Sequence, residues 1–425
     1  MRGDRKRMQY GLVSRRQVLK AASLIAVPQI VPSSAVGRGG AVPPSDRIVL
    51  GGIGLGGRGA GVLASFLGDP EVQFVAIADL RPERRQVIKK MADDKYGTSA
   101  CATYGNMHEL LAREDIDAVL IATGDRWHSP ASIIAAKAGK DIYCEKPCSM
   151  TIAESRALAD AIRRYGRVYQ AGTQRRNVPN FMHAMELARS GKLGKLKTVH
   201  ANTLDPRTTH NWLPAEPEPP KETLDWDAWL GPCPWRPYNS QYVRGRWRGY
   251  FDFHGGGILE WGSHTVDLCQ YAASADSTAP IEYVPQGNQV ICHYASGVKL
   301  VMRDTGWLGM GTCSVRFEGD SGWIETGDTG KMTLSDSLQS EHRVVTMPGT
   351  DPGTNVRDFL DCVKSRKPPR ANADAACQSH IACHAAYIAW QLGRKLTFDP
   401  AKDEFTGDAE ANRMRSRAMR EPWQV

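Results

Sequence analysis

Residues 47–59 read Arg-Ile-Val-Leu-Gly-Gly-Ile-Gly-Leu-Gly-Gly-Arg-Gly, an apolar run that leads directly into a glycine-rich turn. The apolar run predicts a buried strand, and the pattern after it predicts a helix. In such a turn Gly54 would reverse the chain, Gly56 would let a pyrophosphate approach the backbone, and Gly59 would let the helix pack on the strand. Other glycines nearby fit the same spacing, so the turn alone is weak support for a dinucleotide site.

An acidic residue follows the next apolar run, where a ribose-binding carboxylate belongs. Residues 74–78 predict a second strand, and it ends in Asp79. A carboxylate here would accept a hydrogen bond from the adenosine 2′-hydroxyl and repel a 2′-phosphate, which favours NAD. Arg81 keeps NADP open, because a guanidinium can pair with that phosphate. Alternatively, Asp79 caps the helix expected to begin near Pro82.

Strands and helices continue to alternate, which predicts a parallel sheet. Residues 118–123 form a third apolar run, and the loop after it carries Trp127 and His128. Ligands bind at this carboxyl edge of such sheets, so both side chains are candidates for cofactor contact. His128 could equally serve only to lead into the helix predicted over residues 130–138.

The loop Glu145-Lys146-Pro147 follows the next short apolar run, residues 141–144. The proline restricts the backbone beside Lys146. A lysine that is partly desolvated beside other charges can exchange a proton with a substrate hydroxyl. Taken alone, a lysine before a proline is more often solvated surface.

The second half of the chain alternates apolar and polar residues over several stretches, which predicts strands of a different kind of sheet. Among them, residues 255–267 contain Glu260, His264 and Asp267. If this segment is helical, the three side chains share one face, and the carboxylates could orient the imidazole. A buried His264 satisfied by Asp267 is the structural alternative.

From Ile48 to Leu158 the sequence resembles the glucose-fructose oxidoreductase, inositol dehydrogenase and rhizopine-catabolism (Gfo/Idh/MocA) family. The glycine turn, Asp79, Thr123 through His128 and the Glu-Lys-Pro loop match its motifs in order. The resemblance implies an α/β Rossmann domain with a parallel sheet, then an α+β domain with a large open, mostly antiparallel β-sheet. It also implies sugar or inositol substrates. Glu260 stands where the family commonly has aspartate.

The expected organisation is a twin-arginine signal peptide at 1–35, a linker at 36–45, an NAD(P)-binding Rossmann domain at 46–167 and an α+β domain with C-terminal helices at 168–425. The expected catalytic residues are Lys146, His264, Glu260 and Asp267. The expected cofactor contacts are Gly54, Gly56, Gly57, Arg58, Gly59, Asp79, Arg81, Thr123, Trp127, His128, Glu145, Lys146 and Gln174. The expected substrate contacts are Lys146, Arg175, Arg176, Arg246, Trp247, Glu260 and His264.

Most of the positive charge lies in the leader. The chain of 425 residues has a formal charge of +8, and residues 41–425 account for only +1. A near-neutral body offers no electrostatic footprint for nucleic acid. Arg15-Arg16 precede a short apolar run, which resembles a twin-arginine export signal and predicts transport by that translocase to the periplasm or cell envelope. The run is too short to span a membrane permanently.

The cysteines and histidines outside these motifs suggest packing. Ten cysteines are scattered without paired spacing, so we expect no structural disulfide. His380 and His384 are four residues apart on a predicted helix, but no third ligand lies near in sequence. We therefore expect no metal.

The sequence thus predicts an exported oxidoreductase with tightly bound NAD, NADP remaining possible, that oxidises a CH–OH group of a sugar, inositol or sugar derivative. A homo-oligomer formed through the open sheet is expected by resemblance. One alternative is a redox-neutral NAD-dependent glycosidase or lyase of the same family, and the intact Glu-Lys-Pro triplet argues modestly against it. A second is a non-catalytic sugar-binding protein that has kept the fold.

Overall fold

The computed structural model describes residues 42–203, 211–304 and 306–424. The predicted signal peptide at 1–35 and most of the predicted linker lie outside these residues. Ile48 begins a compact body that contains both sheets. None of the helices among the described residues is both long and apolar enough to cross a membrane.

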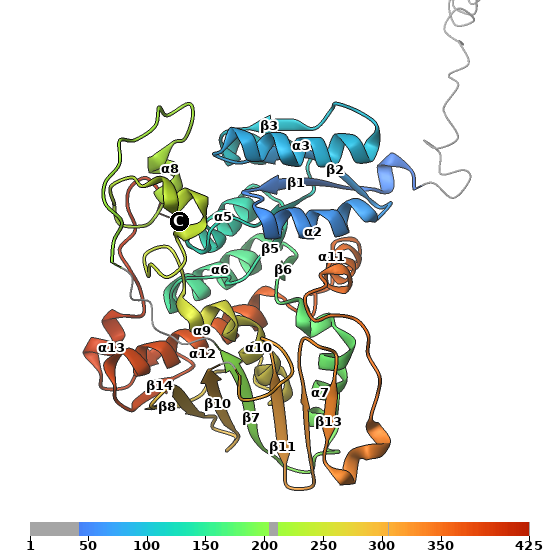
Figure 1. Ribbon diagram of the computed structural model, residues 1–425, viewed down its shortest axis with the longest axis vertical. Helices are drawn as coiled ribbons and strands as arrows, with labels where there is room; N and C mark the ends of the chain where they lie inside the picture. Colours follow the sequence, from blue (N-terminus) through green and yellow to red (C-terminus); the bar gives the residue numbers. More distant parts are fainter. Residues whose placement is uncertain (1–41, 204–210, 305, 425) are drawn as a thin grey trace, which may run out of the picture. The chain divides into compact units, whose positions relative to one another are not determined.

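The first sheet has six parallel strands in the order β3-β2-β1-β4-β5-β6 (Figure 1). The strands are β1 (Ile48–Ile53), β2 (Val72–Ala78), β3 (Ala102–Tyr104), β4 (Ala118–Ile121), β5 (Asp141–Cys144) and β6 (Tyr169–Ala171). Strand β4 is buried throughout, which explains why it is a continuous apolar run rather than an alternating one. The predicted parallel Rossmann sheet is confirmed.

Helices connect these strands and cover both faces of the sheet. They are α2 (Gly57–Gly68), α3 (Pro82–Tyr96), α4 (Met107–Leu111), α5 (Asp125–Lys137) and α6 (Ile152–Tyr165). A helix from late in the chain, α11 (Gly353–Ser365), also joins this core. Its Phe359 meets Phe66 and Tyr143 edge to face at centroid distances of 6.1 and 5.9 Å. The first domain is therefore completed by residues that lie some 200 positions further along the chain.

The second sheet has nine strands in the order β13-β12-β11-β7-β10-β9-β8-β14-β15. The strands are β7 (Leu196–Thr203), β8 (Glu282–Gln286), β9 (Gln289–His293), β10 (Lys299–Asp304), β11 (Val315–Gly319), β12 (Trp323–Thr326), β13 (Met332–Leu334), β14 (Leu396–Asp399) and β15 (Glu404–Phe405). Strands β7 and β10 run parallel, and the remaining neighbours are antiparallel. The predicted mostly antiparallel sheet is confirmed.

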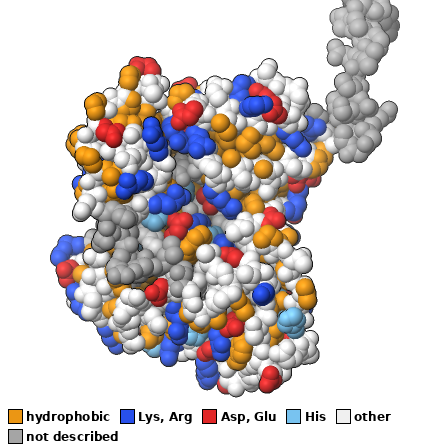
Figure 2. Space-filling view, viewed as in Figure 1, with side chains coloured by type: hydrophobic (Ala, Val, Ile, Leu, Met, Phe, Trp, Pro, Cys, Tyr) orange, Lys and Arg blue, Asp and Glu red, His pale blue; other side chains and the backbone are white. Residues whose placement is uncertain are grey.

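Three helices pack on this sheet: α7 (Pro179–Arg189), α10 (Gly262–Ala272) and α12 (Ala373–Leu392). Helix α12 also contacts α6, so it lies between the two sheets (Figure 1). Shorter helical segments are η3 (Pro44–Asp46), η4 (Gln174–Asn177), α8 (Trp226–Leu230), η5 (Tyr242–Arg246), α9 (Gly256–Glu260), η6 (Asp336–Glu341) and α13 (Ala409–Arg413). On the face shown in Figure 2, Lys and Arg side chains are interspersed with Asp and Glu.

Residues 211–255, here called the aromatic segment, have a small core of their own. Trp226 and Trp229 stack at a centroid distance of 4.7 Å, and Tyr242 and Phe253 pack around them. The segment meets the first domain beside α5. Trp226 and Trp229 therefore serve the packing of this segment.

Candidate active site

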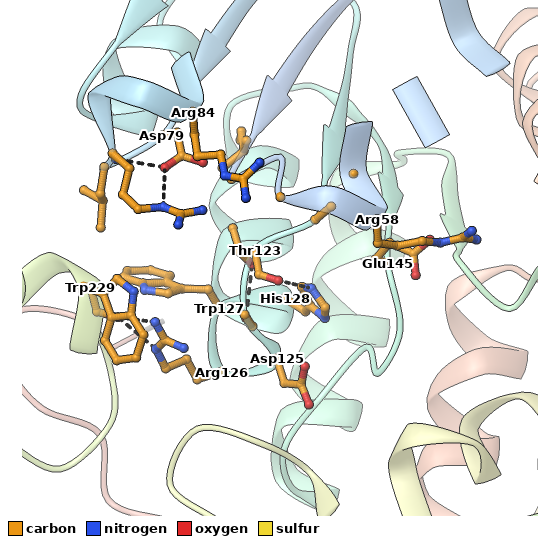
Figure 3. Close-up of a pocket in the computed structure, with 18 of the residues that line it drawn as sticks. Arg58, Asp79, Arg84, Thr123, Asp125, Arg126, Trp127, His128, Glu145 and Trp229 are labelled. Atoms are coloured by element: carbon orange, nitrogen blue, oxygen red, sulfur yellow. Dashed lines mark hydrogen bonds and ion pairs between the residues drawn. The ribbon is translucent and has the colours of Figure 1, made fainter. Parts of the chain in front are cut away.

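A cavity of about 910 Å³ lies at the carboxyl ends of the parallel strands. Its wall includes residues from the first domain and from the aromatic segment (Figure 3), and also residues from the second domain. In an α/β protein this edge of the sheet is where a dinucleotide and its substrate bind.

The glycine turn has the shape that a pyrophosphate requires. Gly54 has a φ of 65°, and a Cβ atom there would lie 2.3 Å from Thr123 Cγ2. A Cβ atom at Gly59 would lie 2.9 Å from Ala122, so this glycine allows α2 to pack closely on the sheet. By contrast, a Cβ at Gly56 or Gly57 would meet nothing within 4 Å. Helix α2 begins after Gly56 without a side-chain cap, so its first amides are available to phosphate oxygens.

One carboxylate and two guanidinium groups line the cavity near the glycine turn. Asp79, at the end of β2, accepts a hydrogen bond from the backbone N–H of Arg81 at 2.9 Å. Burial raises the pKa of this carboxyl, and the nearby Arg81 opposes that effect. Arg84 also lines the cavity beside Asp79 (Figure 3). The residues therefore fit the adenosine ribose of NAD, with two guanidinium groups close by.

The first turn of α5, directly after β4, connects the first domain with the aromatic segment; the helix begins at Asp125, before the start predicted at residue 130, so Trp127 and His128 are helical. His128 is buried, and its ring nitrogens lie 2.7 Å from the Pro147 carbonyl and 3.2 Å from the Thr123 carbonyl. Trp127 donates its indole N–H to the carbonyl oxygen of Ala228 at 3.1 Å. Arg126 donates twice to the carbonyl oxygen of Trp229 and lies 3.6 Å from that ring's centroid (Figure 3). Side chains at the start of α5 thus hold the aromatic segment in place.

Glu145 is buried and paired. Its Oε1 accepts a hydrogen bond from Arg58 Nε at 2.9 Å, and Arg58 also donates to the Thr350 carbonyl at 3.3 Å. A Cβ atom at Gly172 would lie 2.8 Å from the Glu145 carboxyl carbon, so the carboxylate has little room to move. Glu145 therefore fixes Arg58, at the start of α2, against the loop that carries Lys146.

Lys146 contacts Glu260 across the boundary between the domains. Its Nζ lies 2.9 Å from the backbone oxygen of Glu260 and 3.1 Å from Oε1 of the same residue. The side chains of Lys146 and Glu260 are 13% and 17% exposed. The peptide bond between Lys146 and Pro147 is cis, and the ammonium lies 5.2 Å from the centroid of Trp261. The lysine is therefore a partly desolvated cavity residue, not solvated surface.

The other carboxylate oxygen of Glu260 is held by a residue that the sequence motifs did not suggest. His254 Nε2 lies 2.8 Å from Glu260 Oε2. Burial would raise the pKa of Glu260, but the hydrogen bond from His254 and the charge of Lys146 outweigh it and hold the pKa far below its usual range. Glu260 is therefore an anion at neutral pH.

His264 is buried and lines the cavity together with Lys146 and Glu260. Its ring is stacked beside that of Trp261 at a centroid distance of 6.5 Å. Burial and the charges of Arg175 and Lys146 lower the pKa of His264 well below its usual value. Its Nδ1 has no hydrogen-bond partner among the described residues. His264 is thus a neutral imidazole at neutral pH, with a ring nitrogen that no neighbour in the described chain uses.

Asp267 does not join this group. It lies inside α10, and α9 and α10 are separated at Trp261. The carboxylate accepts hydrogen bonds from Arg176 Nε at 2.6 Å and from the Ser379 hydroxyl at 2.9 Å. The predicted contact between Asp267 and His264 is wrong, because a fully buried carboxylate is matched to a buried guanidinium instead.

The predicted substrate residues divide in the same way. Arg175 lines the cavity and is held by Asp328 at 2.7 Å, and Trp247 also lines it, as does Gln174, which was predicted to contact the cofactor. Arg176 is enclosed by Asp267 and Asp276, outside the cavity wall. Arg246 is exposed and donates to Gln241 Oε1 at 2.6 Å. The predictions of substrate contact by Arg176 and Arg246 are therefore not supported, whereas Arg248 and Arg244, from the same stretch, line the cavity.

The two histidines of α12 support the loop behind Lys146. His380 Nε2 accepts a hydrogen bond from the Cys148 N–H at 3.1 Å, and its Nδ1 lies 2.6 Å from the Ala376 carbonyl. His384 Nε2 lies 3.2 Å from the Ser149 hydroxyl. No group of three or more potential metal ligands occurs among the residues that the structure describes. The helical spacing of these histidines therefore serves the Lys146 loop.

Sequence reasoning also missed Trp423. This residue lines the cavity and meets Trp127 edge to face at a centroid distance of 5.3 Å. Arg420 ties the same stretch to the aromatic segment through the Cys233 carbonyl at 2.7 Å. Only the aromatic character of Trp423 could have drawn attention to it, because no motif precedes it.

Comparison with known proteins agrees with this geometry. The model "Oxidoreductase family, NAD-binding Rossmann fold" matches residues 48–173. The model "Oxidoreductase family, C-terminal alpha/beta domain" matches residues 207–425, about half of the chain.

Among curated proteins, a myo-inositol 2-dehydrogenase of Thermotoga maritima is 29% identical over 158 residues, or 37% of this chain and 45% of that protein. A glycosyl hydrolase family 109 protein of Bacteroides fragilis is 38% identical over 120 residues, or 27% and 26% of the two chains. The matched part spans about half the length, or less, of the curated relatives. Among solved structures, the aldose-aldose oxidoreductase of Caulobacter crescentus superposes with a TM-score of 0.60 at 17% identity, covering 83% of this chain and 100% of that one.

Proposed function

The chain belongs to the Gfo/Idh/MocA oxidoreductase family, and on this basis we propose that it oxidises a CH–OH group of a sugar, an inositol or a related polyol with NAD. One observation carries the proposal. Lys146, Glu260 and His264 line the same cavity as the glycine turn and Asp79. Groups that can hold a hydroxyl proton thus lie beside groups that fit a dinucleotide.

Gly54, Gly56 and the amides of α2 would hold the pyrophosphate, and Asp79 would hold the adenosine ribose. NAD supplies the hydride acceptor, which no amino-acid side chain can provide. A 2′-phosphate is less favoured beside Asp79, although Arg81 and Arg84 leave NADP as a second possibility.

Lys146 and His264 would manage the proton of the substrate hydroxyl. Glu260 holds the Lys146 ammonium at two points, so the amine is oriented before any substrate binds. The neutral His264 offers a ring nitrogen as a hydrogen-bond partner. The pH dependence of kcat in Lys146 and His264 variants distinguishes which of the two groups takes the proton.

The test begins with mass spectrometry of nucleotide released from purified protein. A panel of sugars, inositols and sugar derivatives is then offered to the nucleotide-loaded protein, and reduction is followed at the nicotinamide absorbance. Reduction by at least one polyol is expected. A protein that carries or binds NAD but oxidises none of them would contradict the proposal.

A second candidate is redox-neutral cleavage of a glycosidic bond, in which bound NAD is reduced and reoxidised within one turnover. The 38% sequence identity to a glycosyl hydrolase family 109 protein over 120 residues supports this second candidate. Release of aglycone from aryl glycosides without added cofactor would distinguish it, because net dehydrogenation of those substrates consumes NAD.

Export with a tightly held cofactor also belongs to the proposal. It is motivated by Arg15-Arg16 in the leader, which lies outside the described residues. Trp423, held by Arg420 against the aromatic segment, adds an apolar wall to the cavity. Nucleotide that stays bound through gel filtration of the periplasmic protein is expected, and Trp423→Ala should shorten its residence. A protein found only in the cytoplasm would contradict export.

Self-association is proposed through the sheet face that α7, α10 and α12 do not cover. On that face Arg316 forms an ion pair with Glu318 at 2.6 Å and with Glu325 at 3.2 Å. The face is therefore polar, and these three side chains are partly buried. Light scattering of the purified protein tests this, and a monomer at micromolar concentration would contradict it.

A further inference from the structure

The two carboxylate oxygens of Glu260 have different partners. Oε1 faces Lys146 Nζ at 3.1 Å, and Oε2 faces His254 Nε2 at 2.8 Å. The carboxylate therefore bridges the lysine and a histidine that does not line the cavity. A third neighbour, Arg248, lies 4.0 Å from Oε2 with a side chain that is 57% exposed. A pair of that exposure contributes little, so His254 is the main support of Oε2.

His254 is itself held from both sides. The backbone N–H of Gly249 donates to its Nδ1 at 3.4 Å, which leaves the ring proton on Nε2, facing Glu260. The next residue, Gly255, donates its N–H to Asp125 Oδ2 at 3.1 Å, and Asp125 belongs to α5 of the first domain. The edge of Trp247 packs on the ring at a centroid distance of 5.7 Å. His254 is 6% exposed, so its position is set by the fold.

We propose that His254 is a positioning residue for Lys146 and acts through Glu260, an assignment that rests on the oxidoreductase function proposed above. The Nε2–H of His254 fixes Oε2, which turns Oε1 toward the ammonium of Lys146. A freely rotating carboxylate would instead share its oxygens between lysine, solvent and Arg248. The hydrogen-bond chain from His254 through Glu260 to Lys146 keeps the amine in one place and one charge environment.

The bridge also explains the glutamate. Glu260 Oε1 and the backbone oxygen of the same residue both contact Lys146 Nζ, while Oε2 reaches His254, six residues earlier in the chain. An aspartate is one methylene shorter, so its carboxylate could not occupy the same point between the two partners from this backbone position. Glu260 and His254 are therefore expected to work as a pair.

Three variants of the full-length, nucleotide-loaded protein test the proposal with the best substrate from the polyol screen. His254→Gln keeps an N–H donor at about the reach of Nε2, and His254→Leu removes it. We expect His254→Leu to lower kcat about 30-fold with KM changed less than about threefold, and His254→Gln to stay within about threefold of the parent. His293→Leu is the control, since His293, on β9 and 4.0 Å from Glu282 of β8, does not line the cavity.

A double-mutant cycle separates positioning from packing. In a Glu260→Gln background, His254→Leu should lower kcat less than about twofold, because the carboxylate that it acts through is gone. Equal effects of His254→Leu in both backgrounds would overturn the proposal. So would a His254→Gln protein as impaired as His254→Leu, since the donor would then be irrelevant.

A second readout needs no turnover. Acylation of Lys146 by an amine-selective reagent is quantified by peptide mass spectrometry on the intact protein near pH 8. An ammonium held against a carboxylate reacts slowly, so His254→Leu and Glu260→Gln should acylate Lys146 about threefold faster or more, and His254→Gln should not. Unchanged acylation in His254→Leu overturns the positioning role. If this pattern holds while no polyol is oxidised, the proposed function fails and the positioning role stands.

Discussion

The two ends of the cavity present different groups to a ligand. At the dinucleotide end, the recognition surface is backbone: a glycine with positive φ, a glycine open to the cavity and the uncapped start of α2. At the substrate end it is a chain of polar side chains, in which Lys146 meets His254 and Glu260 from a segment more than 100 positions later in the chain. A backbone site depends on local spacing, whereas a side-chain site depends on how distant segments meet.

Loss of the lysine should have the largest effect. Lys146→Met removes the amine that contacts the backbone oxygen and Oε1 of Glu260, and kcat/KM is expected to fall about 1,000-fold. Affinity for NAD should change less than about threefold, because the glycine turn is untouched. Stopped-flow reduction and nucleotide titration measure the two quantities, with exposed Lys402→Met as the control. A Lys146→Met protein that turns over as fast as the parent would refute the catalytic assignment.

Changing the buried pair of Asp267 and Arg176 should reduce stability rather than turnover. Asp267→Asn leaves a fully buried guanidinium with a weaker partner, and the free energy of unfolding is expected to drop by about 3 kcal/mol. Glu260→Gln, whose carboxylate is 17% exposed, should cost less stability and more activity per folded molecule. Urea unfolding followed by tryptophan fluorescence gives the first quantity. If Asp267→Asn kept its stability and lost turnover, Asp267 would belong to the catalytic group after all.

A methyl group at the glycine turn should weaken NAD binding with little effect on the Lys146 contacts. Gly54→Ala forces a side chain into positive φ and against Thr123, and a penalty of about 2 kcal/mol corresponds to a roughly 30-fold loss of NAD affinity. Gly97→Ala is the matched control, because Gly97 has a φ of 64° and open space around it. Calorimetric titration should show a normal NAD affinity for the control. Equal losses in both variants would mean that general destabilisation, not the cradle, is being measured.

The smallest effect concerns the histidines that support the Lys146 loop. Burial lowers the pKa of His380 to about 4 and that of His384 to about 3. Unfolded histidines take up a proton near pH 6.5, so stability is complete above that pH and falls as the pH is lowered toward 4. Each histidine should contribute a slope of about 1.4 kcal/mol per pH unit in that range.

Replacing His380 by Gln should reduce that slope by about one histidine's share between pH 6 and pH 5, in urea unfolding curves. His342→Gln, at an exposed position, should leave the slope unchanged. A His380→Gln protein with the parental slope would show that this ring is not neutral in the folded state.

The same contrast explains what could be predicted from the sequence. The parallel sheet follows from the alternation of strands and helices, and the glycine turn and Asp79 follow from spacing within residues 48–79. The pairing of Lys146 with the Glu260 segment could be expected only through the family resemblance, since 114 positions separate them. Asp267 was misassigned because helical spacing reports a shared face but not which buried cation lies opposite it. His254 carried no periodic signal, and its role appears only when the turn at Gly255 is anchored to Asp125.

The hydrogen bonds that Arg126 and Trp127 of α5 donate to the aromatic segment go to its main chain, beside the stacking of Arg126 on the Trp229 ring. Arg126 and Trp127 donate to the carbonyl oxygens of Trp229 and Ala228, and Arg420 donates to those of Cys233 and Gly231. A carbonyl acceptor is present whatever side chain the residue bears. Residues 211–255 also have their own aromatic core. Substitutions of their cavity-facing side chains, by natural variation or laboratory recombination, could therefore occur without changes in the first domain.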